Sequence, residues 1–195
     1  MSQTLSPTVT LEPFSLARLP RYVAALEAGW SPDNIRGTIA VREQLEAIAH
    51  DPDAFVARSD DPEGRLPPIR GLDGATLPRL PGVTRWIWDD DFCGVVSLRW
   101  SAPGVAELPP HVLGHIGYAV VPWKRGRGCA TAALGLILQE AWRRDLPHVE
   151  LTTQPDNLAS QRVILAQAGT LVGRFEKPAS MGGGESLRFR IARPT

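Results

Sequence analysis

A glycine-rich turn with flanking cations lies in the stretch VVPWKRGRGCA, residues 120–130, between a strand-like and a helix-like segment. The first turn of a helix leaves backbone N–H groups without partners, and the helix dipole favours an anion there. Gly126 and Gly128 let the backbone approach a phosphate, and Lys124, Arg125 and Arg127 place positive charge beside it. These are the parts of a pyrophosphate site. They fit a tight turn with solvated cations equally well, so the pattern alone leaves both interpretations open.

Two nucleotide-binding motifs do not describe this turn. The P-loop pattern GxxxxGK[ST] occurs nowhere in the chain. The dinucleotide pattern GxGxxG is matched by its first two glycines, but Thr131 stands where the last one is required. Glu150 lies at about the distance of a ribose-binding acid, yet it falls inside the segment HVELTT rather than at its end. A nicotinamide-dependent oxidoreductase is therefore the weaker alternative.

The composition is that of an ordinary globular protein, because 43% of the 195 residues are apolar and 22% are charged. The net charge is zero, which argues against a nucleic-acid partner and requires any anion site to be local. Cys93 and Cys129 lie far apart without a CxxC pattern, which excludes a disulfide scaffold and the spacing of a zinc ribbon. We recognise no secretory signal and no membrane span of ~18 apolar residues, which predicts a cytoplasmic protein without a membrane partner.

The elements that must position this turn follow the order β-α-α-β-β-β-α-β-α-β-β. Alternation and turn residues predict strands at 8–13, 84–88, 92–100, 115–121, 148–153, 170–175 and 186–192, with a further strand beginning at 55–57. Helical spacing predicts helices at 16–30, 41–49, 127–145 and 157–168. We therefore expect one α/β (α+β) domain over 1–195, with a mixed sheet of about seven strands and about four helices. A Pro/Gly-rich stretch at about 60–83 predicts a loop insertion.

Two strand-like segments allow side chains to be assigned to a face. Trp86 and Trp88 share one face at a spacing of two, and we expect them in the core rather than in an acceptor pocket. The last strand alternates, which predicts Leu187, Phe189 and Ile191 inward and Ser186, Arg188 and Arg190 outward.

The central segment resembles the GCN5-related N-acetyltransferase (GNAT) superfamily. The signature of that family is a strand ending in V-x-P, followed by [RQ]-x-x-G-x-[GA] at the start of a long helix. This chain has Val120-Val121-Pro122 and then Arg125-Gly126-Arg127-Gly128-Cys129-Ala130. Asn157 and Ser160 in the next helix, and Gly169 after it, fit the family as well. The strong resemblance covers about residues 115–175.

This resemblance implies a mostly antiparallel GNAT-like fold and acetyl-CoA as the acyl donor, with no metal. Acetyl-CoA is expected where the strands HIGYAVV and HVELTT splay apart. Backbone groups of Val120 and Val121 would pair with the pantetheine arm, and Asn157 and Ser160 would contact the pantetheine or the adenosine part. Backbone N–H groups would hold the pyrophosphate, from Arg125, Gly126, Arg127, Gly128, Cys129, Ala130 and Thr131.

The implied reaction is attack of a neutral primary amine on a thioester, which needs a base and donors toward the oxyanion. The candidate bases are Glu107, in the proline-flanked loop AELPPH, and His115, at the start of the central strand. Glu150 is a further candidate, with Asp89–Asp91 more remote. Each of these residues is also compatible with an ordinary structural role.

The sequence departs from the family at the proton donor for the leaving thiol. Many members have a Tyr seven residues after the Asn, but that position is Ile164 here. A thiol with a pKa near ~8.5 leaves tolerably without a donor, so the departure does not forbid catalysis. Tyr118, in the central strand, is expected to pack. Cys129 is rejected as a nucleophile because no Cys-His-Asp set is identifiable near it.

The sequence therefore predicts an acetyl-CoA-dependent N-acetyltransferase acting on a small-molecule or peptide amine. The alternative is a non-catalytic acyl-CoA-binding or sensing module of the same fold, which the missing Tyr keeps open. Edge strands of the C-terminal hairpin allow pairing in a homodimer. The loops at about 60–83 and 101–110 are expected to cover the acceptor, whose identity the sequence does not specify.

Overall fold

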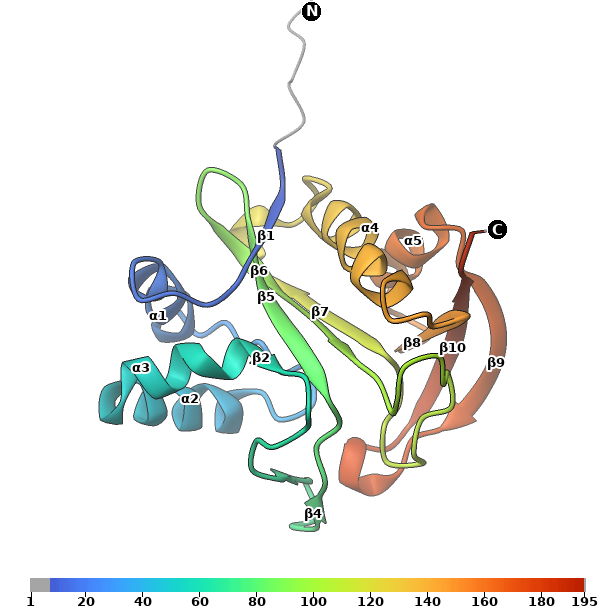
Figure 1. The fold of residues 1–195 in the computed structure, drawn as a ribbon, viewed down its shortest axis with the longest axis horizontal. Helices are drawn as coiled ribbons and strands as arrows, with labels where there is room; N and C mark the ends of the chain where they lie inside the picture. Colours follow the sequence, from blue (N-terminus) through green and yellow to red (C-terminus); the bar gives the residue numbers. More distant parts are fainter. Residues whose placement is uncertain (1–7, 195) are drawn as a thin grey trace, which may run out of the picture.

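The computed structural model describes residues 8–194, which form two β-sheets that meet along strands β7 and β8 (Figure 1). The first sheet has the order β1-β5-β6-β7, with β2 paired to β5, and the second has the order β8-β10-β9. Neighbouring strands within each sheet are antiparallel. The strands of the first sheet are β1 (Thr10–Glu12), β2 (Asp60–Asp61), β5 (Gly82–Trp88), β6 (Phe92–Arg99) and β7 (Ile116–Val120). Those of the second are β8 (His148–Thr153), β9 (Thr170–Glu176) and β10 (Glu185–Ala192).

Helices cover the sheets in two groups, with α1–α3 on one side and α4 and α5 on the other (Figure 1). The α-helices are α1 (Leu19–Glu27), α2 (Thr38–His50), α3 (Pro52–Val56), α4 (Cys129–Trp142) and α5 (Leu158–Ala166). Short 3₁₀ turns lie at η1 (Ala57–Ser59), η2 (Pro122–Lys124) and η3 (Ala179–Met181). The predicted α/β class and the order of the long elements are confirmed, although the described residues contain more short strands and one more helix than expected.

The strand expected to begin at 55–57 is wrong, because Phe55 and Val56 belong to helix α3. The residues before it explain the helix. Pro52 occupies the first turn, where its missing N–H costs nothing, and Asp51 Oδ1 accepts a hydrogen bond from Ala54 N (2.8 Å). A three-residue apolar run without alternation was too short to distinguish the two possibilities.

The core consists of two clusters on opposite faces of the first sheet. One cluster packs α4 and α5 against both sheets, and it includes Val96, Leu134, Ile137, Leu151 and Phe189. The other packs α1 and α3 against the first sheet and is aromatic, with Tyr22, Trp30, Phe55, Trp86 and Phe92. Trp86 is fully buried there and Trp88 is half-buried against the same cluster, which agrees with the core assignment of this pair.

Strand β10 buries the residues that were predicted to face inward, but it also buries one that was predicted to face outward. Leu187, Phe189 and Ile191 are buried as predicted. Ser186 was expected outward, yet it is buried and its Oγ donates a hydrogen bond to Thr153 O (3.1 Å). Its small hydroxyl is satisfied by a backbone carbonyl, so burial carries no unpaired polar group.

The Pro/Gly-rich stretch at 60–83 is a long connection with a little structure of its own. Strands β3 (Ile69–Arg70) and β4 (Thr76–Leu77) pair as a separate two-stranded hairpin, and the first two residues of β5 also fall in this range. None of the helices in the described chain has the length and apolar character needed to cross a membrane.

Candidate active site

Strands β7 and β8 touch at one end and separate toward the other. His115 N, just before β7, donates to Glu150 O in β8 (2.7 Å), and a Cβ on Gly114 would lie only 2.8 Å from the same oxygen. Beyond this contact the two strands are not paired, because β7 is an edge strand of the first sheet and β8 is an edge strand of the second. The expected splay between HIGYAVV and HVELTT is therefore present, and it opens toward Val120.

The register of β6 on β7 decides which backbone groups line this opening. Val121 N donates to Cys93 O (2.9 Å) and Arg99 N donates to His115 O (2.9 Å), so every second residue of this segment faces β6. Tyr118 and Val120 are the residues in between, and their N–H and C=O groups point toward β8. The backbone pairing suggested for Val120 is geometrically available, whereas the N–H of Val121 is already committed to β6.

The loop after β7 presents a row of unpaired N–H groups. Gly128 is the N-cap of α4 with φ 80°, and Gly126 has φ 72°, a left-handed conformation that favours glycine. A Cβ on either residue would meet nothing within 4 Å, so the space above the loop is open. Within the described chain, no protein atom accepts a hydrogen bond from the backbone N–H groups of residues 126–131. Cys129, Ala130 and Thr131, in the first turn of α4, belong to this row.

The three cationic side chains of the loop differ in their contacts. Arg125 and Arg127 are exposed, and Arg125 Nε donates to Val120 O (3.1 Å). Lys124 instead turns inward, where its Nζ contacts Asp89 Oδ1 (2.6 Å) with both side chains largely buried. Of the three cations, the two arginines are the exposed ones beside the row of N–H groups, so the expected contribution of Lys124 to an anion site is wrong.

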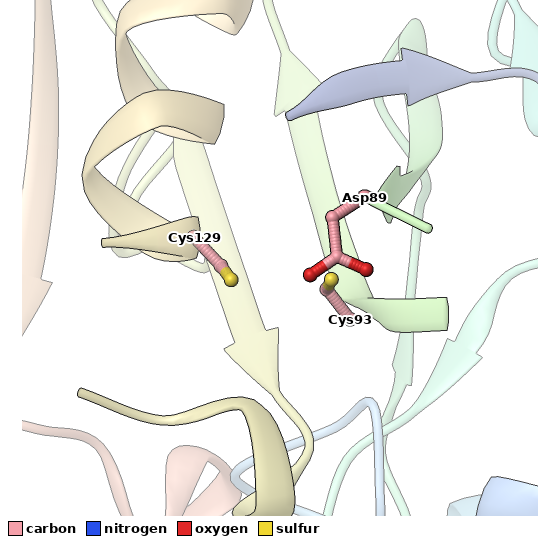
Figure 2. A group of neighbouring side chains, drawn as sticks. All are labelled: Asp89, Cys93 and Cys129. Carbon is pink, nitrogen blue, oxygen red and sulfur yellow. The ribbon is translucent and has the colours of Figure 1, made fainter. Parts of the chain in front are cut away.

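A polar cluster lies between this loop and strand β6. The carboxylate of Asp89 and the sulfur atoms of Cys93 and Cys129 all lie within 4.8 Å of one another (Figure 2). Burial opposes ionisation of Asp89, but hydrogen bonds from Lys124 and the Asp91 N–H outweigh it and hold the Asp89 pKa below its usual range. Burial raises the pKa of the Cys93 thiol. Because Lys124 already neutralises the carboxylate, the cluster anchors the loop to β6 and needs no ion.

Helix α5 contacts the splay through its first turn. Asn157 is exposed and caps α5, with its Oδ1 accepting from Ser160 N (3.0 Å). The Ser160 Oγ lies 2.8 Å from the hydroxyl of Tyr118, so a hydrogen bond crosses the opening from β7 to α5. Tyr118 packs against the core as expected, but sequence reasoning missed this hydroxyl. Ile164, at the position of the family Tyr, is fully buried.

His115 lies at the closed end of the splay. It is fully buried, and its Nδ1 accepts a hydrogen bond from Glu150 N (2.9 Å). The neutral ring therefore carries its proton on Nε2. Burial lowers the pKa of His115 to about 4. Neither nitrogen is free to take a proton from an amine, so the geometry favours a role in joining β7 to β8. His111 lies four residues before His115 in the chain. Its Nε2 is 3.2 Å from Pro78 O, so the two histidines do not form a common metal site.

Glu107 lines a cavity of about 300 Å³ between the loop 106–112 and the second sheet. His148, Glu150, Arg188 and Arg190 line the same cavity. Glu150 is held by Arg190 (2.7 Å) and Arg188 (3.5 Å), whereas the carboxylate of Glu107 is exposed and has no partner among residues 8–194. Of the two carboxylates, only Glu107 is free to accept a proton without first breaking an ion pair.

The row of free N–H groups thus lies at the open end of the two splayed strands. Residues 74–167 match the family model described as an acetyltransferase (GNAT) domain. The resemblance inferred from the sequence is therefore confirmed. Among curated proteins, no sequence matches this chain.

Solved structures share the fold over nearly the whole chain. RimJ of Mycobacterium smegmatis, solved with a CoA disulfide, is 19% identical with a TM-score of 0.61, covering 96% of this chain and 83% of its own. RimL, a ribosomal L7/L12 α-N-protein acetyltransferase solved with coenzyme A, is 14% identical with a TM-score of 0.61 and 96% coverage of both chains. The microcin C7 self-immunity acetyltransferase MccE, solved with acetyl-CoA and AMP, is 15% identical with a TM-score of 0.58, covering 95% of this chain and 92% of its own.

Proposed function

We propose that this chain is an acetyl-CoA-dependent N-acetyltransferase that moves an acetyl group to a primary amine by direct attack on the thioester. The observation that carries the proposal is the continuity of two features: the edge of β7 at Val120 and the free N–H groups of residues 126–131. An extended arm with a pyrophosphate at its end fits this arrangement. The family match and the CoA-bound neighbours RimJ and RimL support the same donor.

In this proposal the loop binds the pyrophosphate through its N–H groups, with Arg125 and Arg127 adding charge. Arg125 must first release Val120 O, which it contacts at 3.1 Å, so that the pantetheine can pair with this edge. The N–H of Val120 points into the splay and serves as a donor toward the thioester carbonyl. Asn157 and Ser160 flank the arm from the first turn of α5.

The chemistry requires that the amine lose one proton and the sulfur gain one. The amine nitrogen attacks the carbonyl carbon, a C–N bond forms, and the C–S bond breaks as the tetrahedral intermediate collapses. We assign proton removal to Glu107, acting directly or through water, because its carboxylate is unpaired and lines a cavity. We assign the proton for the departing thiolate to the Tyr118 hydroxyl, which lies in the splay where Ile164 offers none.

The test separates binding from transfer. Calorimetric titration with acetyl-CoA should show one site, and thiol release over a panel of primary amines should show turnover with an acetylated amine as product. Binding without turnover across peptide and small amines would favour the non-catalytic acyl-CoA module instead. No response to acetyl-CoA or CoA would remove both proposals.

A further inference from the structure

Arg99 stands out among the arginines on the face of the sheets opposite α4 and α5, which we name the acceptor face. In β6, Leu98 belongs to the core under α4, so the alternating residues Ser97 and Arg99 point to the acceptor face. The same alternation places Gly117 of β7 there, next to Ile116. Arg99 is half-buried, and one hydrogen bond, from Nη2 to Ser97 Oγ (2.9 Å), holds its guanidinium.

Three other arginines on this face have carboxylate partners. Arg188 and Arg190 share Glu150. Arg36, in the loop between α1 and α2, pairs with Glu43 (2.5 Å). Arg99 forms no ion pair with any residue between 8 and 194. None of the Arg99 nitrogens is buried without a hydrogen-bond partner, so its unused donors face solvent, where a bound anion would satisfy both its charge and its planar array of N–H groups.

The guanidinium of Arg99 lies beside the part of β7 that faces the splay. A Cβ on Gly117 would lie 3.6 Å from Arg99 Nη2 and 3.7 Å from Ser97 Oγ, so this glycine leaves the surface above β7 clear. The carbonyl of Tyr118, the residue after Gly117, accepts a hydrogen bond from Asn34 Nδ2 (3.4 Å). This contact brings the loop between α1 and α2 over the same edge of β7. An acceptor reaching the thioester from this face would therefore pass Arg99.

Arg99 keeps its positive charge at neutral pH despite its surroundings. Burial lowers the pKa of Arg99, Asp33 partly offsets this, and Arg79 adds to the lowering. An arginine nevertheless keeps its proton in proteins at neutral pH. Arg79, whose Nε is held by Pro67 O (2.7 Å), is a second cation without a carboxylate partner in the described chain. Asp33 and Asp61 both influence Arg79, as do Arg36 and Arg58, so the region holds carboxylates as well as cations, yet neither Arg99 nor Arg79 forms an ion pair within the described chain.

We propose that the acceptor carries an anionic group, a carboxylate or a phosphate, close to its primary amine, and that Arg99 binds this group. The inference rests on the proposed acetyltransferase function and names the substrate class of that site. The carboxylate can belong to a small amino acid or to an acidic side chain next to a peptide amine. Arg99 is thus a specificity residue: it selects the acceptor and takes no part in proton transfer.

The experiment compares amines in matched pairs that differ only in the anion. 4-Aminobutanoate is compared with its amide, O-phosphoethanolamine with ethanolamine, and a peptide with Asp after its N-terminal residue with the same peptide carrying Asn. Thiol release gives kcat/KM for each, and calorimetry gives the affinity of each amine for the complex of protein and CoA. The wild-type protein should favour the anionic member of at least one pair by about 10- to 100-fold, the range of a charge-assisted hydrogen bond. The pair that responds identifies the source of the anion.

The Arg99→Gln variant should erase this preference by weakening the binding of the anionic amines and lowering their kcat/KM. Arg193→Gln is the matched control, because Arg193 forms an exposed pair with Asp145 and lies beyond the last strand. Equal treatment of anionic and neutral amines by the wild-type protein, or a preference that survives Arg99→Gln, would overturn the inference. If no amine is acetylated, the transferase proposal fails, and the calorimetric comparison still decides whether Arg99 recognises the anion.

Discussion

A negatively charged side chain at Gly128 should weaken acetyl-CoA binding for an electrostatic reason that can be isolated from backbone strain. Gly128 has φ 80°, and a non-glycine residue there costs roughly 1–2 kcal/mol of folding free energy. Gly128→Gln and Gly128→Glu share this strain and nearly the same volume. A Cβ at this position meets nothing within 4 Å, so neither side chain has to displace the core. The two variants differ only in a negative charge beside the row of free N–H groups.

The magnitude follows from the distance between like charges. A carboxylate about 4–6 Å from a pyrophosphate oxygen is repelled by about 1–3 kcal/mol near a protein surface, where the effective dielectric lies between those of protein and water. Acetyl-CoA should therefore bind Gly128→Glu about 5- to 150-fold more weakly than Gly128→Gln. Salt should narrow this difference, because the loop is exposed and the charges are screened.

The assay is calorimetric titration with acetyl-CoA at low and high salt, together with thermal unfolding of each variant. Gly74→Glu is the control, since Gly74 has the same φ of 80° and open space around it but lies in the turn between β3 and β4. It should lose stability without losing affinity. If Gly128→Glu binds acetyl-CoA as tightly as Gly128→Gln, the pyrophosphate does not lie on this loop and the assignment of the site is refuted.

Three further predictions concern the residues around the splay. Tyr118→Phe should lower kcat by about 10-fold with the KM for acetyl-CoA unchanged. Adding Ser160→Ala should reduce kcat little further, because the two hydroxyls form one hydrogen-bonded pair. His115 has a folded pKa of about 4 against its ordinary 6.5, so the unfolded chain takes up the proton first as the pH falls. Denaturant titrations should show up to about 3 kcal/mol of stability lost between pH ~6.5 and 4 through His115, and His115→Gln should lose less over this range, keeping the part that comes from His148, whose pKa burial also lowers. Lys124→Met should destabilise the fold by about 3–5 kcal/mol by leaving the buried carboxylate of Asp89 unpaired, and Asp89→Asn in the same chain should restore much of it in thermal unfolding.

The sequence predicted the parts of the fold that local patterns determine. The long helix after Gly128 and the strand at 148–153 have strong periodicity or turn residues at their ends, and the structure has both elements. The helix begins two residues later than expected because Gly128, in a left-handed conformation, serves as its N-cap. The short run at 55–57 was misassigned because a capping interaction, rather than periodicity, decides it.

The site required tertiary information that no local pattern contains. The direction of the Lys124 side chain depends on Asp89, which lies in the hairpin turn before β6. The partner of Tyr118 is a serine 42 residues away in the chain. Which of Val120 and Val121 faces the splay depends on the register against β6, because a shift of one residue would exchange them. That Arg99 has no carboxylate partner emerges only once the described residues around it are placed.

The most direct test of the central claim is transfer of a labelled acetyl group. The purified protein is incubated with isotope-labelled acetyl-CoA and a panel of small and peptide amines, and the amines are analysed by mass spectrometry while free thiol is measured in parallel. We expect labelled amide on at least one amine, equimolar with the thiol released, and a decrease of both products in Gly128→Glu relative to Gly128→Gln when acetyl-CoA is below saturation. Acetyl-CoA that binds but yields neither product across the panel, or equal product formation by the two Gly128 variants, would contradict the proposed transfer at this site.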